Sequence, residues 1–364
     1  MKITRTGGIA ALALTGALAL SSCAANETQT TDDSSTASTL TGTIDAGGAG
    51  SQASAEEAWV AAFQEANPDV TINYTDTGSG TGRSNFIDGS FDFAGTDSAL
   101  SDDEIAGGFA LCVDDSFIQV PAFIDPIAVI YNVDGVDELN LDSTTIAKIF
   151  KGEITNWNDP AIAALNEGTT FPDLAITAVH RSDDSGTTKN FTDYLFQTAP
   201  DVWTEAAADK FPYSTGEAAQ GTSGVVDAVT NGTGTIGYAS ASRAGEIGVA
   251  KIKVGDEFVE YSAEAAAAVV DGSPAADNAS DTNLAIKINR VTDNPDEYPL
   301  VLVSYLIACG EYQDATLAPV VKAYLAFVTS EEGQEIAAGT GSAPLSSSQI
   351  SAVQSVIDTI VVTE

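Results

Sequence analysis

The chain has 364 residues, and 14 lysines and arginines against 52 aspartates and glutamates give it a formal net charge of −38. At roughly 100–200 residues per domain, this length predicts two domains or one large two-lobed unit, and a hydrophobic content of 44% is enough for a core. The acidity excludes binding to nucleic acid or to an anionic membrane surface, because both attract clustered basic side chains. One histidine and three cysteines exclude zinc fingers and iron–sulfur clusters, so we expect no metal and no cofactor.

Residues 1–22 have the pattern of a secretory signal peptide. Lys2 and Arg5 form a short basic start, and the apolar run over 7–20 follows it. This run ends in the tetrapeptide LSSC, which is typical of a bacterial lipoprotein in which cleavage leaves Cys23 as the lipidated, palmitate-bearing N-terminus. An ordinary signal peptide with an incidental cysteine is the alternative. The pattern predicts an extracytoplasmic protein that contacts the cell membrane only through a lipid anchor.

Residues 23–40 are polar and predict a disordered tether with a reach of roughly 20–25 Å. The other two cysteines, Cys112 and Cys309, lie in apolar, strand-like segments at 109–113 and 300–308. Outside the cytoplasm these cysteines are in an oxidising compartment. They predict either a disulfide between distant parts of the chain or two buried free thiols.

Beyond the tether, short strand-like runs alternate with helical stretches. This alternation predicts an α/β fold, a two-lobed periplasmic-binding-protein-like arrangement with largely parallel sheets. Residues 263–276 are alanine-rich and predict either a helix or a surface excursion. The expected strands are 43–45, 70–74, 91–94, 120–131, 176–180, 235–238 and 301–307, and the expected helices are 53–66, 84–87, 144–150, 159–166, 188–198, 225–229 and 317–329.

Three turns rich in glycine and hydroxyl side chains precede predicted helices, at 47–51, 78–82 and 185–187. Helix N-termini present unpaired backbone N–H groups and a partial positive charge, glycine lets a ligand approach closely, and serine and threonine add hydroxyl donors. One such turn is usually only a helix cap. Three of them in one α/β chain predict a site for a small oxyanion.

Arg181 lies four residues before Ser185 and is the expected countercharge, with Asp183 or Asp184 holding its guanidinium flat. An ordinary ion pair at a strand end is the alternative for Arg181. A carboxylate in an anion site, Asp97, makes sense if the ligand carries a proton, because a carboxylate accepts a hydrogen bond from P–OH and repels sulfate. The predicted ligand is therefore phosphate.

Two further side chains have a structural interpretation. His180 is adjacent to Arg181 in the predicted strand and so points to the opposite face. We therefore expect it to pack rather than bind. Trp157, in an Asn/Asp/Pro turn, is expected to pack as a local lid over the core rather than touch a ligand.

At these residues the sequence resembles the phosphate-binding subunit of the bacterial Pst-type ABC transporter. The resemblance covers most of the chain from about Leu40 to Phe327, and the order and spacing of seven motifs make it specific. The motifs are GAGS (48–51), INYTDTGSGTG (72–82), FDFAGTDSAL (91–100), FKGEITNWNDPAIAALN (150–166), HRSDDSGTT (180–188), GTIGYA (234–239) and YPLVLVSYLI (298–307).

The resemblance implies a hinged protein that seals phosphate between two lobes and presents it to an importer with permease and ATPase subunits. By motif, it implies that Asp97 accepts the proton of phosphate and that Asp183 orients Arg181. The other phosphate-binding residues that it implies are Ser51, Ser79, Arg181, Ser185, Gly186 and Thr187. The first turn departs from the family pattern, so Ser51 is paired with Gly50 in one register and with Gln52 in the other.

The resemblance also implies the lobe boundaries. The first lobe would be discontinuous, residues 41–120 plus 300–364, and the second would be residues 121–299, with the hinge where the chain crosses between them. Phosphate would be captured rather than chemically changed, so we expect no enzyme activity.

Three alternatives remain open. The first is a binding protein for sulfate, molybdate or arsenate, and the second is a sensory or adhesive surface protein. The third is a secreted serine hydrolase using Ser185 with His180 and an aspartate. The chain has no GxSxG motif, which disfavours the hydrolase.

Overall fold

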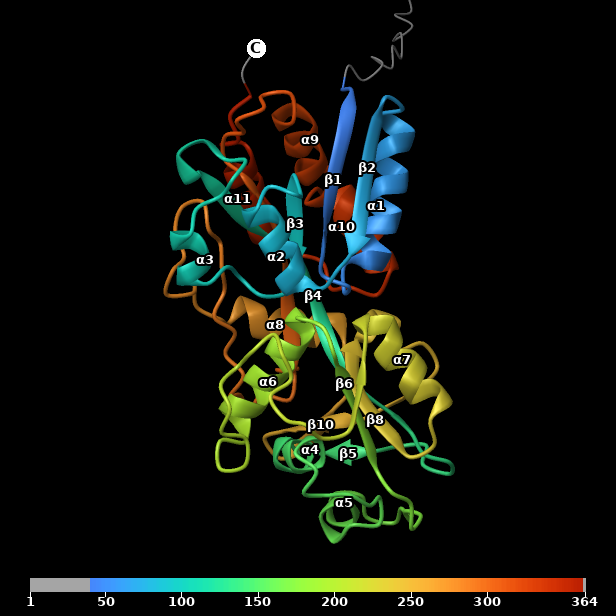
Figure 1. The fold of residues 1–364 in the computed structure, drawn as a ribbon. Coiled ribbons are helices and arrows are strands. Elements are labelled where there is room, and N and C mark those ends of the chain that lie inside the picture. Colours follow the sequence, from blue (N-terminus) through green and yellow to red (C-terminus); the bar gives the residue numbers. More distant parts are fainter. Residues whose placement is uncertain (1–39, 363–364) are drawn as a thin grey trace, which may run out of the picture. The chain divides into compact units, whose positions relative to one another are not determined.

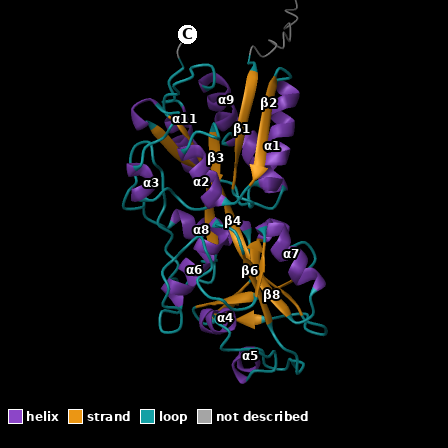
Figure 2. Cartoon of the chain, in the orientation of Figure 1, coloured by secondary structure: helices purple, strands orange, loops and turns teal. Residues whose placement is uncertain are grey.

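The computed structural model describes residues 40–362. Helices and strands alternate along this part of the chain (Figures 1 and 2). The strands are β1 (Gly42–Gly48), β2 (Val70–Asp76), β3 (Phe93–Thr96), β4 (Phe117–Asn132), β5 (Asn140–Leu141), β6 (Thr177–Arg181), β7 (Glu217–Ala219), β8 (Thr235–Ser240), β9 (Gly248–Val249), β10 (Lys251–Val254), β11 (Glu257–Val259) and β12 (Val301–Cys309). The helices are α1 (Ala53–Ala66), α2 (Ser79–Ile87), α3 (Asp102–Ala106), α4 (Ser143–Phe150), α5 (Pro160–Leu165), α6 (Gly186–Thr198), α7 (Gly221–Asn231), α8 (Ala263–Asp271), α9 (Ala318–Val328), α10 (Glu331–Gly339) and α11 (Ser347–Ile357).

Most of the predicted elements are present, with shifted ends. Helix α1 has the predicted bounds, and the alanine-rich segment forms helix α8. Helices α2 and α6 begin at Ser79 and Gly186, earlier than predicted, so the glycine turns form the first turn of each helix. The strand-like segment 109–113 forms only an isolated bridge, from Cys112 to Tyr312, and directly after it Asp114 and Asp115 adopt positive φ angles and turn the chain.

Nine strands form one mixed sheet in the order β2-β1-β3-β12-β4-β8-β6-β7, with β9 pairing to β4. Strands β1, β2 and β3 are parallel to one another where they pair, and β6 is parallel to β7 and β8. The centre is antiparallel, since β12 runs against both β3 and β4, and β4 runs against β8. The prediction of largely parallel sheets is therefore wrong for the centre, where two long strands run in opposite directions.

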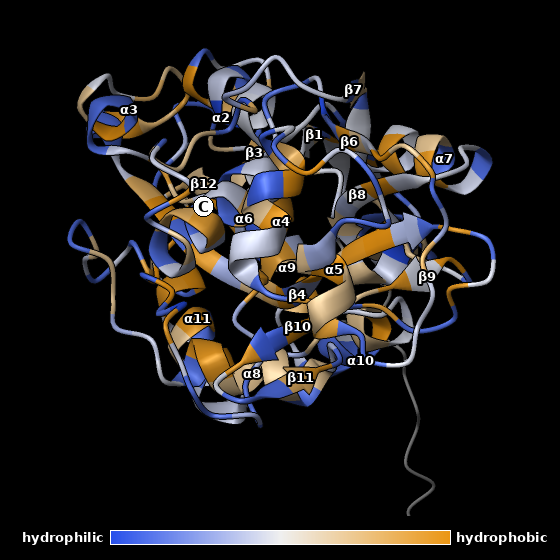
Figure 3. Cartoon of the chain, turned by 90° about the horizontal axis from the view of Figure 1, so that it is seen from below, coloured by the Kyte–Doolittle hydropathy of each residue, from blue (hydrophilic) through white to orange (hydrophobic). Residues whose placement is uncertain are grey.

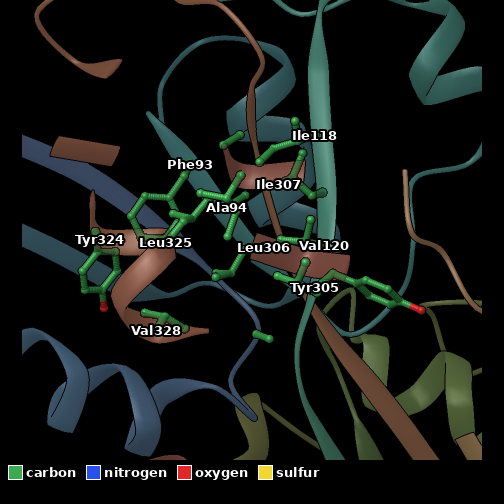
Figure 4. Close-up of a cluster of buried hydrophobic side chains, with 14 of the residues drawn as sticks. Phe93, Ala94, Ile118, Val120, Tyr305, Leu306, Ile307, Tyr324, Leu325 and Val328 are labelled. Carbon is green, nitrogen blue, oxygen red and sulfur yellow. The ribbon is translucent and has the colours of Figure 1, made fainter. Parts of the chain in front are cut away.

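Two large hydrophobic clusters share the strands β4 and β12. In the first cluster Phe93, Leu306 and Tyr324 pack together, as Figure 4 shows. The second contains Trp157 and Leu302, and a smaller third cluster lies around α7 and β8. The covering helices carry hydrophobic and hydrophilic residues together, as α4 and α11 show in Figure 3. This pattern is typical of helices that cover a core with one side.

Cys112 and Cys309 are joined by a disulfide, and both are buried in the first cluster. The bond links the segment after α3 to the last residue of β12, across a sequence separation of 197 residues. Among residues 40–362, no helix combines the length and apolar character needed to cross a membrane.

Glu56 is a buried carboxyl group inside helix α1, with only 1% of its surface exposed. One of its oxygens accepts a hydrogen bond of 2.6 Å from the hydroxyl of Tyr324, and the other has no partner in the described part of the chain. Burial raises the pKa of Glu56 to about 8, although the Tyr324 hydroxyl lowers it. Because the unfolded chain ionises near its ordinary value, this group makes folding less favourable as the pH rises from about 4.5 to about 8.

We expect Glu56→Gln to raise the free energy of unfolding by roughly 1–3 kcal/mol at pH 8 and by little at pH 4.5. Glutamine keeps an acceptor for Tyr324 and cannot ionise. Urea unfolding at the two pH values measures the effect, with Glu57→Gln at the exposed neighbouring position as the control. An equal effect of Glu56→Gln at both pH values would show that ionisation of Glu56 is not the cause.

Candidate functional site

The three predicted turns come together at one place. The first two follow the parallel neighbours β1 and β2, so they meet at one edge of the sheet. A Cβ atom on Gly82 would lie 2.5 Å from the Cα of Gly48, which shows how closely α2 approaches the first turn. A Cβ atom on Gly186 would lie 2.6 Å from the Cβ of Asp97 and 2.7 Å from Oγ of Ser79, so the third turn packs against the second turn and against the segment that follows β3.

Glycine is required at two of these positions for different reasons. At Gly186 any side chain would collide with Asp97, so only glycine lets the start of α6 reach this site. Gly78 has a φ of 84°, a left-handed conformation that glycine adopts without strain, and it turns the chain from β2 into α2. After this turn the N–H of Gly80 donates to the carbonyl of Asp184 at 3.1 Å, which joins the second turn to the third.

Asp97 follows β3 and is 3% exposed. Its Oδ1 accepts hydrogen bonds from Oγ of Ser51 at 2.5 Å and Oγ of Ser304 at 2.7 Å, and its N–H donates to Oγ of Ser79 at 3.1 Å. Burial raises the pKa of Asp97, although the two hydroxyls and the charge of Arg181 lower it. The result is a buried carboxyl group that accepts hydrogen bonds from two hydroxyl groups.

Arg181 ends strand β6 and is 3% exposed. Its Nε donates to Oδ1 of Asp183 at 2.7 Å, its Nη2 donates to the other oxygen of the same carboxylate, and its Nη1 donates to Oγ1 of Thr222 at 3.2 Å. Burial raises the pKa of Asp183, but the hydrogen bonds and charge of Arg181 and the N–H of Gly221 outweigh burial and lower it. A charged carboxylate thus holds the guanidinium group in a fixed plane.

Ser185 caps helix α6, since its Oγ accepts a 3.2 Å hydrogen bond from the N–H of Thr188. Thr187 lies in the first turn of α6, and its buried Oγ1 has no hydrogen-bond partner within residues 40–362. The helix N-terminus therefore supplies backbone N–H groups and a buried hydroxyl at the point where the three turns meet.

In the first turn, the hydroxyl of Ser51 is directed at Asp97. Gln52 is committed elsewhere, because its N–H donates to the carbonyl of Ala49 at 3.2 Å and its side-chain amide donates to Oγ of Ser304 at 2.7 Å. A Cβ atom on Gly50 would lie 2.7 Å from a carboxylate oxygen of Asp76, so the Asp76 side chain lies directly against this turn.

The combined evidence of sequence and fold identifies the family. The model of the PBP superfamily domain matches residues 33–332. The phosphate-binding protein PstS 3 of Mycobacterium tuberculosis is 37% identical over 337 residues, which cover 89% of this chain and 90% of that protein. The chain belongs to the PstS family of phosphate-binding proteins. PstS 2 of the same organism is 34% identical over 359 residues, 95% of this chain and 96% of that protein.

Solved structures show the same fold for this PstS-family chain. A high-affinity periplasmic phosphate-binding protein (PfluDING), bound with phosphate, has a TM-score of 0.70 at 21% identity, over 86% of this chain and 93% of its own. A phosphate ABC transporter substrate-binding protein from Clostridium perfringens, described as putative, was solved with bound phosphate. It has a TM-score of 0.59 at 21% identity, over 84% of this chain and 100% of its own.

Three side chains that sequence reasoning missed also lie in this PstS-family site. Ser304 is a polar residue in the otherwise apolar run of β12, and Thr222 lies in a glycine and hydroxyl turn at the start of α7. The sequence pattern could therefore have indicated both residues. Asp125 lies on β4 two residues after Phe123, which pairs with Ser304, so it shares the face of Ser304. Both carboxyl oxygens of Asp125 are buried, and burial raises the pKa of this group well above its ordinary value, although the hydroxyl of Ser240 lowers it.

His180 and Trp157 pack in the structure as the sequence predicted. The imidazole ring of His180 stacks on Phe211 with centroids 4.1 Å apart, and its Nδ1 lies 2.9 Å from the carbonyl of Arg181. Trp157 is fully buried and donates from Nε1 to the carbonyl of Gly234 at 3.0 Å. Among residues 40–362, His180 is held by these contacts and makes no hydrogen bond to Ser185.

Proposed function

We propose that this protein binds inorganic phosphate outside the cytoplasm and delivers it to the permease and ATPase subunits of an ABC importer. Phosphate binding is what its PstS relatives are named for. The observation that carries the assignment is the buried carboxyl group of Asp97, which accepts hydrogen bonds from Ser51 and Ser304 and lies against the start of α6. A carboxylate can accept the hydrogen bond of a protonated oxyanion, and phosphate carries such a proton. The protein is a binding and transport protein rather than an enzyme.

In this proposal Arg181 supplies the charged donor and Asp183 orients it. Asp97 accepts the phosphate proton. The remaining donors are the hydroxyls and N–H groups of Ser51, Ser79, Ser185, Gly186 and Thr187. Since the N–H of Gln52 is engaged with Ala49, the contacts favour Gly50 as the neighbour of Ser51 in the first turn.

Phosphate would be captured by closure of two lobes. The lobes would be residues 41–120 with 300–364 and residues 121–299, and the long strands β4 and β12 would form the hinge. The two large hydrophobic clusters share these strands, but the first also contains Ala266, Val269 and Ile288, so α8 packs with the first lobe although the proposed boundaries assign it to the second. Closure would exclude water and strengthen each hydrogen bond to phosphate. The net charge of −38 opposes the approach of an anion, so the affinity must come from these local donors.

The signal peptide (1–22), the lipidated Cys23 and the tether up to residue 39 lie outside the described residues. We keep the lipid anchor as part of the proposal, on the strength of the LSSC sequence. It would hold the binding domain near the membrane that contains the importer.

We expect Asp97→Asn to weaken phosphate binding by about 10–100-fold and to allow measurable binding of sulfate. The amide NH₂ group would offer sulfate a donor where the carboxylate repels it. Isothermal titration of the anion-free protein with both ligands, at two pH values, measures the effect.

Asp103→Asn, at an exposed position on α3, is the control and should match the wild type. If Asp97→Asn loses phosphate but still rejects sulfate, the role of Asp97 in selectivity is wrong. Equal binding of both anions by the wild type would indicate a less selective oxyanion-binding protein.

A further inference from the structure

A second group of polar contacts surrounds Arg83, beside the phosphate-binding turns. Arg83 lies on α2 and is 4% exposed. Its Nη2 donates to Oδ2 of Asp209 at 2.8 Å, its Nη1 donates to Oγ of Ser98 at 2.6 Å and to Oγ1 of Thr96 at 3.1 Å, and its Nε donates to Glu104 at 2.8 Å. Every nitrogen of the guanidinium group is therefore used.

Asp209 lies far from Arg83 in sequence, in the segment between α6 and β7, yet it makes three contacts here. Besides Arg83, its carboxylate accepts a 3.0 Å hydrogen bond from Oγ of Ser98. Its backbone carbonyl accepts the N–H of Ser185 at 2.9 Å. Asp209 thus ties Arg83 and Ser98, which come from the first proposed lobe, to the turn that begins α6 in the second.

The strength of the ion pair between Arg83 and Asp209 depends on how helix α2 lies relative to the segment between α6 and β7. The side chains of Arg83 and Asp209 are only 5% and 19% exposed. Burial lowers the pKa of Arg83, but the charges and hydrogen bonds of Asp209 and Glu104 outweigh it and raise the pKa. If the segments separated, Asp209 would return to water and its attraction to Arg83 would be screened, while Arg83 would keep its ion pair with Glu104. The pair therefore stabilises only the arrangement in which the two segments touch.

We propose that Arg83, Asp209 and Ser98 form a latch that holds the cleft closed over bound phosphate and sets how slowly phosphate leaves. This inference rests on the proposed function, because it takes phosphate binding and lobe closure as given. None of the three residues is among the proposed phosphate ligands. The N–H of Gly80 that donates to the carbonyl of Asp184 adds a neighbouring contact between the same two segments. A group that interacts only in the closed state shifts the population toward that state.

The test is the dissociation rate of phosphate from full-length protein carrying Asp209→Asn, which removes the charge and keeps the shape. We expect the rate to rise about 10-fold, with the association rate and the preference for phosphate over sulfate unchanged. Arg83→Gln and the double variant complete a double-mutant cycle, and non-additive rates would show that the two side chains act as one unit.

The matched control is Asp277→Asn, which breaks the exposed pair with Lys287 (63% and 92% exposed for the lysine and aspartate side chains) and should leave the rate unchanged. A lower melting temperature of Asp209→Asn without faster dissociation would assign the pair a purely structural role and overturn the latch. If the wild type bound phosphate normally and Asp209→Asn matched it in every rate, the latch would fail and the proposed function would stand. If the wild type did not bind phosphate, the proposed function itself would fail.

Discussion

Replacing Arg181 with alanine is expected to weaken phosphate binding by roughly 10²–10³-fold, measured by isothermal titration. Arg181 is the charged donor of the proposed site, and it is buried where water cannot replace it. Its removal also leaves Asp183 without its guanidinium partner. The incoming anion would then meet the carboxylates of Asp97 and Asp183 without the guanidinium group that offsets them in the wild type.

Two variants separate charge from geometry in this prediction. Arg181→Lys keeps the charge but cannot make the two-pronged contact with Asp183, so an intermediate loss is expected. Asp183→Asn keeps the arginine and loosens its orientation, so the smallest loss is expected. If the phosphate affinity of Arg181→Ala were within fivefold of that of the wild type, the charge of Arg181 would contribute little. The backbone and hydroxyl donors would then provide the affinity.

Replacing both Cys112 and Cys309 with serine is expected to lower the free energy of unfolding by about 2–5 kcal/mol. The disulfide closes a loop with a sequence separation of 197 residues, so the unfolded chain loses much conformational freedom when it is present. Denaturant unfolding of wild type and variant measures the difference.

Reduced wild-type protein provides the matching control, because without the disulfide it should unfold like the double variant. The stability of the double variant should not change when reductant is added. The two cysteines make no contact with the proposed phosphate ligands in the described structure, so phosphate affinity should be retained. A loss of stability below 1 kcal/mol would mean that the first hydrophobic cluster already restricts these segments.

The sequence predicted well those features that are local in the chain. Helix α1 was predictable because apolar residues recur at helical spacing and Pro68 follows its end. The three turns were predictable because glycine and hydroxyl residues mark helix starts. The contact between Arg181 and Asp183 was also predictable, since the two residues are only two positions apart.

Features that depend on distant segments could not be predicted in the same way. The position of Ser304 beside Asp97 requires β12 to lie between β3 and β4, and no local pattern specifies that neighbour. The antiparallel centre of the sheet was missed for the same reason. Arg83 was missed because its partner Asp209 lies 126 residues away, in a segment with no regular pattern.

The place of β12 in the sheet also determines the order in which the molecule can be completed. Strands β1 to β3 are synthesised first. The edge of β3 that does not pair with β1 pairs with β12, which lies near the end of the chain. Helices α9 to α11, which pack in the first hydrophobic cluster, are synthesised after β12. The part of the molecule that is synthesised first is therefore finished last, and its early strands need protection until residues 301–309 arrive.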